Sequence, residues 1–274
     1  MNTKLIKPIF IVGAARSGTT MLAESVLSKH PDIAYLSEPT PIWKFGNAYK
    51  THDILTVNNT NQESINHIIH AFNSFAISSG KKRLMEKHPS NCLRIPFIDH
   101  VFPDAKFVHL IRDGRDVALS AKVEWTGMPG DAIDRRDLRA SPKLLRLVKT
   151  IRREIDKLKP RPRIYEIPAY ISRLVDLVRR QIFGPDSVLW GPRIPGLKEI
   201  RSAYSLLETC AIQWEFCTRS AQSAGLMMPT DRFIEIRYED LLQEPRLVVQ
   251  KICEFLELNL NHELLEILVT DISR

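Results

Sequence analysis

Four polar segments of this sequence carry side chains that bind anions or move protons. The first is R-S-G-T-T at residues 16–20, which follows the apolar run 9–12 and Gly13. Gly13 and Gly18 suit a tight turn whose backbone N–H groups point at an anion, and the helical pattern of residues 21–27 adds its positive N-terminal end. This turn predicts a cradle for a phosphate or sulfate group.

The spacing of the turn is that of the nucleotide-binding loop G-x-x-x-x-G-K-[ST], except that Thr19 stands at the lysine position. Because that lysine contacts the β- and γ-phosphates of a triphosphate, its absence argues against ATP as the ligand. Arg16 and Ser17 can supply a cation and a hydroxyl to a smaller anionic group, and Thr20 follows them at the start of the helix. The structural alternative is an ordinary strand, turn and helix of the core.

The other three polar segments stand where further predicted strands end. They are Ser37 with Glu38 after residues 33–36, Lys87 with His88 at the end of 84–87, and Arg112 to Arg115 after 106–111. Ser120 lies eight residues after Arg112, about two turns into the next predicted helix. In a parallel sheet the carboxyl ends of the strands meet at one edge, and ligands bind there. We therefore expect these side chains to share one site.

Strand and helix patterns alternate along the chain, which predicts an α/β fold with a mostly parallel central sheet flanked by helices on both faces. The expected strands are residues 9–12, 33–36, 84–87, 106–111 and 233–237. The expected helices are residues 63–77, 115–121, 204–221, 245–256 and 263–269. Trp214, Phe216 and the histidine at 109 are expected in the core.

The chain has 274 residues, 44% of them hydrophobic, which suffices for one large domain. No apolar run approaches the roughly 20 residues of a membrane helix, and Arg16 interrupts the first run too early for a signal peptide. The four cysteines are far apart, without a C-x-x-C spacing, and we interpret them as buried thiols and expect no metal site. The expected location is the cytoplasm.

The net charge of +7 is concentrated in one region. Residues 131–201 hold 18 Lys and Arg against 9 Asp and Glu, a net charge of +9, so the rest of the chain carries −2. Residues 142–159 and 168–181 place basic residues between apolar ones at helical spacing. We expect a basic helical insertion over 128–201, which contacts an anionic acceptor or a membrane surface, covers the site, or simply presents solvated helix faces. Nucleic acid is not an expected partner, since no aromatic stacking pattern accompanies the charge.

Together these motifs resemble the sulfotransferases that use 3′-phosphoadenosine 5′-phosphosulfate (PAPS), with the tyrosylprotein sulfotransferases and their bacterial relatives looking closest. The resemblance spans most of the chain. R-S-G-T-T is similar to the family's 5′-phosphosulfate loop, and Arg112 with Ser120 in I-R-D-G-R-D-V-A-L-S is similar to its 3′-phosphate element. Further matches are H-P-D at 30–32, F-P-D-A-K-F at 102–107 and R-Y-E-D-L at 237–241.

The resemblance implies a P-loop-like three-layer sandwich, a PAPS donor and a hydroxyl-bearing acceptor, namely a saccharide, a lipid, a small molecule or a peptide. It implies Glu38, seven residues after Pro31, as the catalytic base and Lys87 as the cation that assists the leaving group. Arg16 would hold the transferring group. The implied nucleotide-binding residues are Arg16, Ser17, Gly18, Thr19, Thr20, Arg112, Ser120 and Tyr238.

The chemistry of sulfuryl transfer agrees with these roles, because it needs positioned cations and dipoles, a carboxylate base and no metal. Alternatives remain for single residues: Glu38 can cap a turn, Lys87 can be structural, and His88 can be the base. Two rival functions also remain, a nucleotide kinase or NTPase and a non-catalytic nucleotide-binding protein. The family commonly has a further basic loop near its C-terminus, whereas this sequence stops at Arg274, so we expect a truncated chain or a variant without that cover.

Overall fold

The computed structural model describes residues 7–126, 175 and 189–272. The chain divides into two compact units, Met1–Ala118 with Gly191–Arg274, and Leu119–Trp190. The basic helices expected at 142–159 and 168–181 lie outside the described residues, apart from residue 175, so the insertion 128–201 stays a prediction. None of the described helices has the length and hydropathy needed to cross a lipid bilayer.

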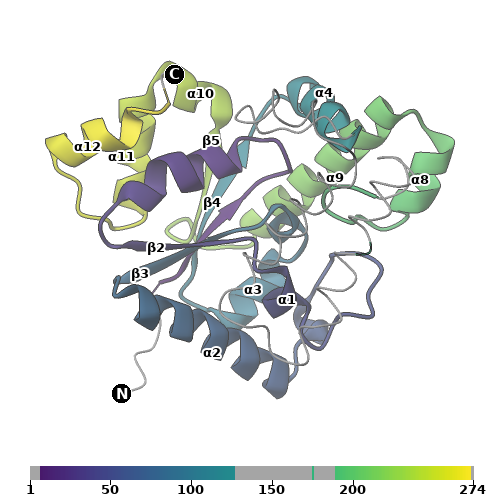
Figure 1. Ribbon diagram of the computed structural model, residues 1–274, viewed down its shortest axis with the longest axis horizontal. Coiled ribbons are helices and arrows are strands. Elements are labelled where there is room, and N and C mark those ends of the chain that lie inside the picture. Colours follow the sequence, from purple (N-terminus) through teal and green to yellow (C-terminus); the bar gives the residue numbers. More distant parts are fainter. Residues whose placement is uncertain (1–6, 127–174, 176–188, 273–274) are drawn as a thin grey trace, which may run out of the picture. The chain divides into compact units, whose positions relative to one another are not determined.

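Five parallel strands form the sheet of the first unit, in the order β2-β3-β1-β4-β5 (Figure 1). They are β1 (Ile9–Val12), β2 (Ile33–Ser37), β3 (Arg83–Lys87), β4 (Lys106–Ile111) and β5 (Phe233–Arg237). The central strand β1 pairs Ile11 with Lys87 of β3 and Val12 with His109 of β4. Its four residues are fully buried, which explains why its sequence is apolar without alternation. All five carboxyl ends therefore lie at one edge.

Helices cover both faces of this sheet (Figure 1). The α-helices are α1 (Thr40–Lys44), α2 (Gln62–Ser79), α3 (Ile95–Val101), α4 (Gly114–Trp125), α8 (Leu197–Ala203), α9 (Leu206–Gly225), α10 (Tyr238–Gln243), α11 (Pro245–Phe255) and α12 (His262–Val269). Within the described residues, short segments of other helix types are η1 (Met21–Val26), η2 (Leu27–Lys29), η3 (Val57–Asn59) and η4 (Pro89–Leu93). Helix α2 begins and ends on local signals: the Asn61 side chain accepts from Ser64 N at its start, and Gly80 closes it with a φ of 65°.

One face of the sheet packs against η1, α10, α11 and α12, and its core is aliphatic. Ile11 and Val108 from the strands meet Leu22 of η1, Val249 of α11 and Leu268 of α12. The opposite face is aromatic. Its rings surround Phe10 of β1 at centroid distances of 5.5 to 6.3 Å and belong to Trp43, Phe72, Phe102 and Phe107.

A buried charge network lies within the aromatic face. Glu86 of β3 is fully buried, and its carboxylate accepts from Trp43 Nε1 at 3.2 Å and from Asn91 Nδ2 at 2.6 Å. Arg94 is 2% exposed, donates to Asn91 Oδ1 at 2.9 Å and stacks 5.0 Å over the Trp43 ring. Burial raises the pKa of Glu86 to about 7, although Arg94 and these hydrogen bonds oppose the shift.

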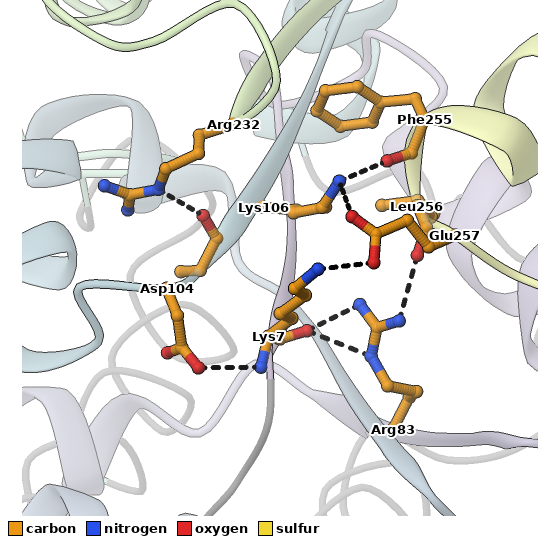
Figure 2. A network of polar contacts seen from close by, with 9 residues as sticks. Lys7, Arg83, Asp104, Lys106, Arg232, Phe255, Leu256 and Glu257 are labelled. Atoms are coloured by element: carbon orange, nitrogen blue, oxygen red, sulfur yellow. Dashed lines mark hydrogen bonds and ion pairs between the residues drawn. The ribbon is translucent and has the colours of Figure 1, made fainter.

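Ion pairs and hydrogen bonds join the elements at the opposite, amino-terminal edge of the sheet (Figure 2). We call Lys7, Arg83, Lys106 and Glu257 the amino-edge clasp. Lys7 precedes β1, Arg83 begins β3, Lys106 begins β4, and Glu257 follows α11. The Glu257 carboxylate accepts from Lys106 Nζ at 2.8 Å and from the Lys7 ammonium. Lys106 Nζ also donates to the carbonyl of Phe255 at 2.6 Å.

The Arg83 guanidinium adds three hydrogen bonds to the clasp. Nε and Nη2 donate to the carbonyl of Lys7 at 3.1 and 2.6 Å, and Nη1 donates to the carbonyl of Leu256 at 2.9 Å. Hydrogen bonds from Lys106 and then Lys7 lower the pKa of Glu257 to about 2, so its carboxylate is ionised at neutral pH. The clasp thus ties the starts of three strands to the end of α11.

The predicted α/β fold with a parallel sheet is confirmed, and the five expected strands are the five strands of the sheet. The four cysteines are free and buried, as expected, and His109 is fully buried in β4. Trp214 and Phe216 differ from the expectation, since both are only half-buried on α9.

Glu86 should make stability depend on pH. Between its ordinary pKa of 4.5 and its folded pKa of about 7, the folded protein holds a proton that the unfolded chain has released. This contribution is fully present below pH 4.5 and is lost as the pH rises through about 7, a change on the order of 3 kcal/mol. Urea unfolding at pH 5 and pH 8 should show this loss in the wild type and not in Glu86→Gln. Parallel pH profiles for the two proteins would contradict the assignment.

Removing Arg83 should destabilise the first unit. Arg83→Met leaves the carbonyls of Lys7 and Leu256 without their charged donor, so we expect a loss of about 2–3 kcal/mol in the free energy of unfolding. The matched control is Lys82→Met, whose side chain is 78% exposed beside Asp32, and it should cost less than about 0.5 kcal/mol. Equal losses for the two variants in urea unfolding would show that the hydrogen bonds of Arg83 contribute nothing to stability.

Candidate active site

The loop after β1 brings the predicted anion-binding residues to the carboxyl edge of the sheet. Ser17 N donates to the carbonyl of Ala14 at 3.1 Å, which closes a turn, and Leu22 N donates to the carbonyl of Gly18 at 3.0 Å, which starts the helix. Gly18 has a φ of 90° and Arg16 a φ of 75°. Only glycine adopts such angles readily, so the backbone at Arg16 is strained. The turn leaves the Arg16 side chain exposed and Ser17 buried.

The threonines of the loop divide between the core and the surface. Thr19 is buried, whereas Thr20 is exposed. Thr19 packs close to Gly13: a Cβ added there would lie 2.6 Å from Thr19 Cγ2 and from the carbonyl oxygen of Leu110. Gly13 is thus required by close packing of the loop against β4. The helix that follows is π-helical over η1. This helix form is rare overall, but where it occurs it is often at a functional site.

Tyr238 links the loop to the end of β4. Its ring lies against Gly18, where an added Cβ would meet ring carbons at 2.5 Å. The guanidinium of Arg112 stacks on the same ring, 4.6 Å from its centroid. Since β4 and β5 pair Ile111 with Arg237, the residues that follow the two strands are neighbours. The structure therefore brings Gly18, Tyr238 and Arg112 together.

Glu38 and Lys87 form an ion pair where β2 and β3 end. Lys87 Nζ lies 2.6 Å from Glu38 Oε1; the lysine side chain is 3% exposed and the glutamate 41%. Glu38 N also donates to the carbonyl of Lys87 at 3.0 Å. Glu38 has a φ of 47°, a second strained backbone among the predicted site residues. A buried ammonium thus faces a carboxylate that is open to solvent, next to the strand that leads into the Gly13 loop.

Two atoms of the predicted nucleotide-binding residues have unused hydrogen-bonding capacity. Ser17 Oγ and Arg112 Nε are buried, and neither has a hydrogen-bond partner within the part of the chain that the structure describes. Arg112 pairs with Asp116 at 3.5 Å through its Nη2. Ser120 lies on α4 in the second unit, so its expected pairing with Arg112 stays a prediction.

Sequence reasoning missed two contacts that shape this edge, those of Glu239 and Trp214. Glu239 Oε1 accepts from Asp113 N at 2.8 Å and so joins the loop after β4 to the start of α10. The R-Y-E-D-L motif contains Glu239 and could have indicated it. Trp214 packs on Gly114, where a Cβ would lie 2.5 Å from the indole ring. The Asp113 carboxylate accepts hydrogen bonds from the Arg115 guanidinium and from the Arg115 backbone N–H, which lower its pKa to about 2.

His88 uses both ring nitrogens in local hydrogen bonds. Its Nδ1 accepts from Ser90 N at 3.0 Å, and its Nε2 lies 2.9 Å from Thr40 Oγ1. No sequence pattern indicated Thr40, because its contact with His88 depends on the register between β2 and β3.

The sequence matches the model of a protein family described as "Sulfotransferase family" over residues 8–168 and 173–262. Among curated proteins, it is 32% identical over 120 residues to a putative protein-tyrosine sulfotransferase of Caenorhabditis briggsae, covering 41% of each chain. It is 27% identical over 135 residues to the nodulation protein NoeE of Sinorhizobium fredii, covering 44% of this chain and 32% of that protein. The matches thus span well under half the length of these relatives.

A solved structure shares this architecture. Sulfotransferase STF9 from Mycobacterium avium superposes with a TM-score of 0.53 at 14% sequence identity, covering 98% of this chain and 68% of that one. At this identity the likeness establishes the fold, an α/β P-loop-like sandwich.

The strain at Glu38 can be measured by comparing two variants that both lack the carboxylate. Because the backbone φ is 47°, Glu38→Gly should be more stable than Glu38→Ala by about 1 kcal/mol. At Lys251, exposed within α11, the order should reverse, with Gly less stable than Ala by about 1 kcal/mol. Urea unfolding of the four variants measures both differences. The same order at both positions would mean that Glu38 is not strained.

Proposed function

Because this chain belongs to the sulfotransferase family, we propose that it transfers a sulfuryl group from PAPS to a hydroxyl group of an acceptor. The observation that carries the proposal is the 2.6 Å pair between buried Lys87 and solvent-open Glu38, beside the strand that leads into the anion-binding loop. This arrangement offers a base to a substrate and holds a cation 2.6 Å from that base.

The donor fits the residues at the carboxyl edge of the sheet. The loop residues Arg16 to Thr20 would hold the 5′-phosphosulfate, with the N–H groups of the turn and the Ser17 hydroxyl as donors. Arg112, together with Ser120, would hold the 3′-phosphate, and Tyr238 would support both ends. The buried Ser17 Oγ and Arg112 Nε, without partners among the described residues, are consistent with a polyanionic ligand.

In the transfer, the protein accepts a proton, stabilises the sulfuryl group and stabilises the leaving phosphate. The acceptor oxygen attacks sulfur as its proton passes to the Glu38 carboxylate, the bond between sulfur and the 5′-phosphate oxygen breaks, and the bisphosphate leaves. Arg16 and the backbone N–H groups of the loop stabilise the sulfuryl group during transfer, while Lys87 stabilises the charge that develops on the leaving phosphate. The products are a sulfate ester and 3′-phosphoadenosine 5′-phosphate (PAP). No step requires a metal ion, and this independence remains a prediction.

The acceptor is a saccharide, a lipid, a small molecule or a peptide, and the basic region 128–201 favours one that is anionic or membrane-associated. Since one curated relative is named a putative protein-tyrosine sulfotransferase, peptide tyrosine is the acceptor to test first. The free cysteines fit a reducing compartment, and we keep the cytoplasm as the proposed location.

Calorimetric titration with PAP tests the nucleotide site. We expect micromolar binding without magnesium, lost in Arg112→Ala because the guanidinium is removed. Gly18→Ala should also abolish binding, since the new Cβ would lie 2.5 Å from the Tyr238 ring. Gly80→Ala is the matched control, because it has a similar positive φ but no atom within 4 Å of the added Cβ, and it should bind normally.

The same titration separates the rival functions. Binding of ATP with magnesium, and not of PAP, would replace the proposal with a kinase or NTPase. Binding of PAP without turnover of PAPS on any hydroxyl acceptor would indicate a nucleotide-binding protein that is not an enzyme.

A further inference from the structure

We propose that His88 is a positioning residue, which holds the backbone turn of Glu38 through the hydroxyl of Thr40 and does not itself accept the proton of the acceptor. This inference rests on the proposed function, because it takes Glu38 as the base. It addresses the histidine next to Lys87, which the sequence alone leaves as a competing base.

The hydrogen bonds of the imidazole fix its tautomer. Nδ1 accepts from the backbone N–H of Ser90 at 3.0 Å, so this nitrogen carries no hydrogen. In a neutral ring the hydrogen is then on Nε2, which donates to Thr40 Oγ1 at 2.9 Å. The one lone pair that a base would use is therefore already engaged with Ser90 N. A ring bound in this way is suited to holding two segments together.

Thr40 closes the turn that carries Glu38. Its backbone N–H donates to the carbonyl of Glu38 at 2.7 Å across Pro39, whose φ of −76° and ψ of 61° are those of an inverse γ-turn. At the other side, Glu38 N donates to the carbonyl of Lys87 at 3.0 Å. The bond between Thr40 and His88 thus ties the far end of the turn to the same segment that holds its near end.

The turn needs such support because its backbone is strained. A left-handed conformation is unfavourable for a residue other than glycine, and Glu38 has a φ of 47°. Relaxation of this residue would carry its carboxylate away from Lys87 Nζ. We infer that the Thr40–His88 bond opposes that relaxation and keeps the carboxylate at the reacting position.

His88 is itself anchored from the interior of the first unit. Ser90, whose N–H it accepts, donates through Oγ to Asp53 Oδ2 at 2.7 Å. The same Asp53 oxygen accepts from Arg193 N at 2.9 Å, and Asp53 N donates to the carbonyl of Arg193 at 2.8 Å. Support for the Glu38 turn therefore runs from a buried carboxylate through Ser90 and His88 to Thr40.

Three variants separate positioning from proton transfer. Thr40→Val removes the hydroxyl at nearly constant volume, and Thr40→Ser keeps it. His88→Asn retains a side-chain acceptor for Ser90 N but is too short to reach Thr40. Thr270→Val is the control for loss of a hydroxyl, because Thr270 Oγ1 bonds only a local carbonyl of α12 among the described contacts.

Two readouts are measured on the full chain. Hydrogen exchange followed by mass spectrometry reports on residues 37–44, and release of PAP from PAPS, with water and with 4-nitrophenol as acceptors, reports on turnover. We expect faster exchange and a kcat lower by about 10- to 100-fold in Thr40→Val and His88→Asn, with the KM for PAPS unchanged. The double variant, Thr40→Val with His88→Asn, should have the same exchange and kcat as either single variant. Thr40→Ser and Thr270→Val should leave both readouts at the wild-type level.

Unchanged exchange and kcat in Thr40→Val would overturn the proposal. Loss of turnover in His88→Asn alone would identify His88 as the base instead. If the wild type binds no PAP and releases none from PAPS, the proposed function fails. The exchange of residues 37–44 still decides whether His88 holds the turn, since it requires no substrate.

Discussion

The parallel pairing of β1 between β3 and β4 is the constraint on which the candidate site depends. Because the paired strands run in the same direction, the loop after β1, the end of β3 and the end of β4 lie at one edge. β2 and β5 extend that edge outward and add Glu38 and Tyr238. A reversal of any one strand would move its terminal residue to the opposite edge. Parallel pairing is possible here because β1 is apolar on both faces and is covered on both.

The two edges of the sheet differ in how their charges are used. At the amino edge, the Glu257 carboxylate accepts from lysine cations, and the Arg83 guanidinium donates to backbone carbonyls. These bonds join elements that are distant in sequence (Figure 2). At the carboxyl edge, Arg16 and Glu38 occupy strained backbone positions, and Arg112 Nε lacks a partner among the described residues. Stability is thus provided at one edge, while the other retains strain and unused hydrogen-bonding capacity, which are features of sites that await a ligand.

The features that were correctly predicted from the sequence are those that a local pattern of residues determines. The five strands and the longer helices follow from apolar runs and periodicity, and the loop follows from its two glycines. The short helices α1, α3, α8 and α10 were missed because five to seven residues carry too little periodicity. The strain at Glu38 and its bond to Lys87 could not be derived either, since both depend on the register of β2 against β3. Trp214 was expected in the core because it is apolar, yet it packs on Gly114 at half burial, a contact set by the placement of α9.

The ring of Tyr238, held between Gly18 and Arg112, has a consequence for selectivity. A rigid aromatic spacer fixes the separation between the turn of the anion-binding loop and the guanidinium, because neither neighbour can approach further without a clash. Under the proposed function, the pair acts as a gauge of length: a ligand with two anionic groups at the matching separation would engage both ends, and the second contact would form at high effective concentration. A ligand with a single anionic group, or with two at another spacing, gains one contact only. Discrimination between nucleotides can thus arise from the thickness of one side chain, without any group that reads the base.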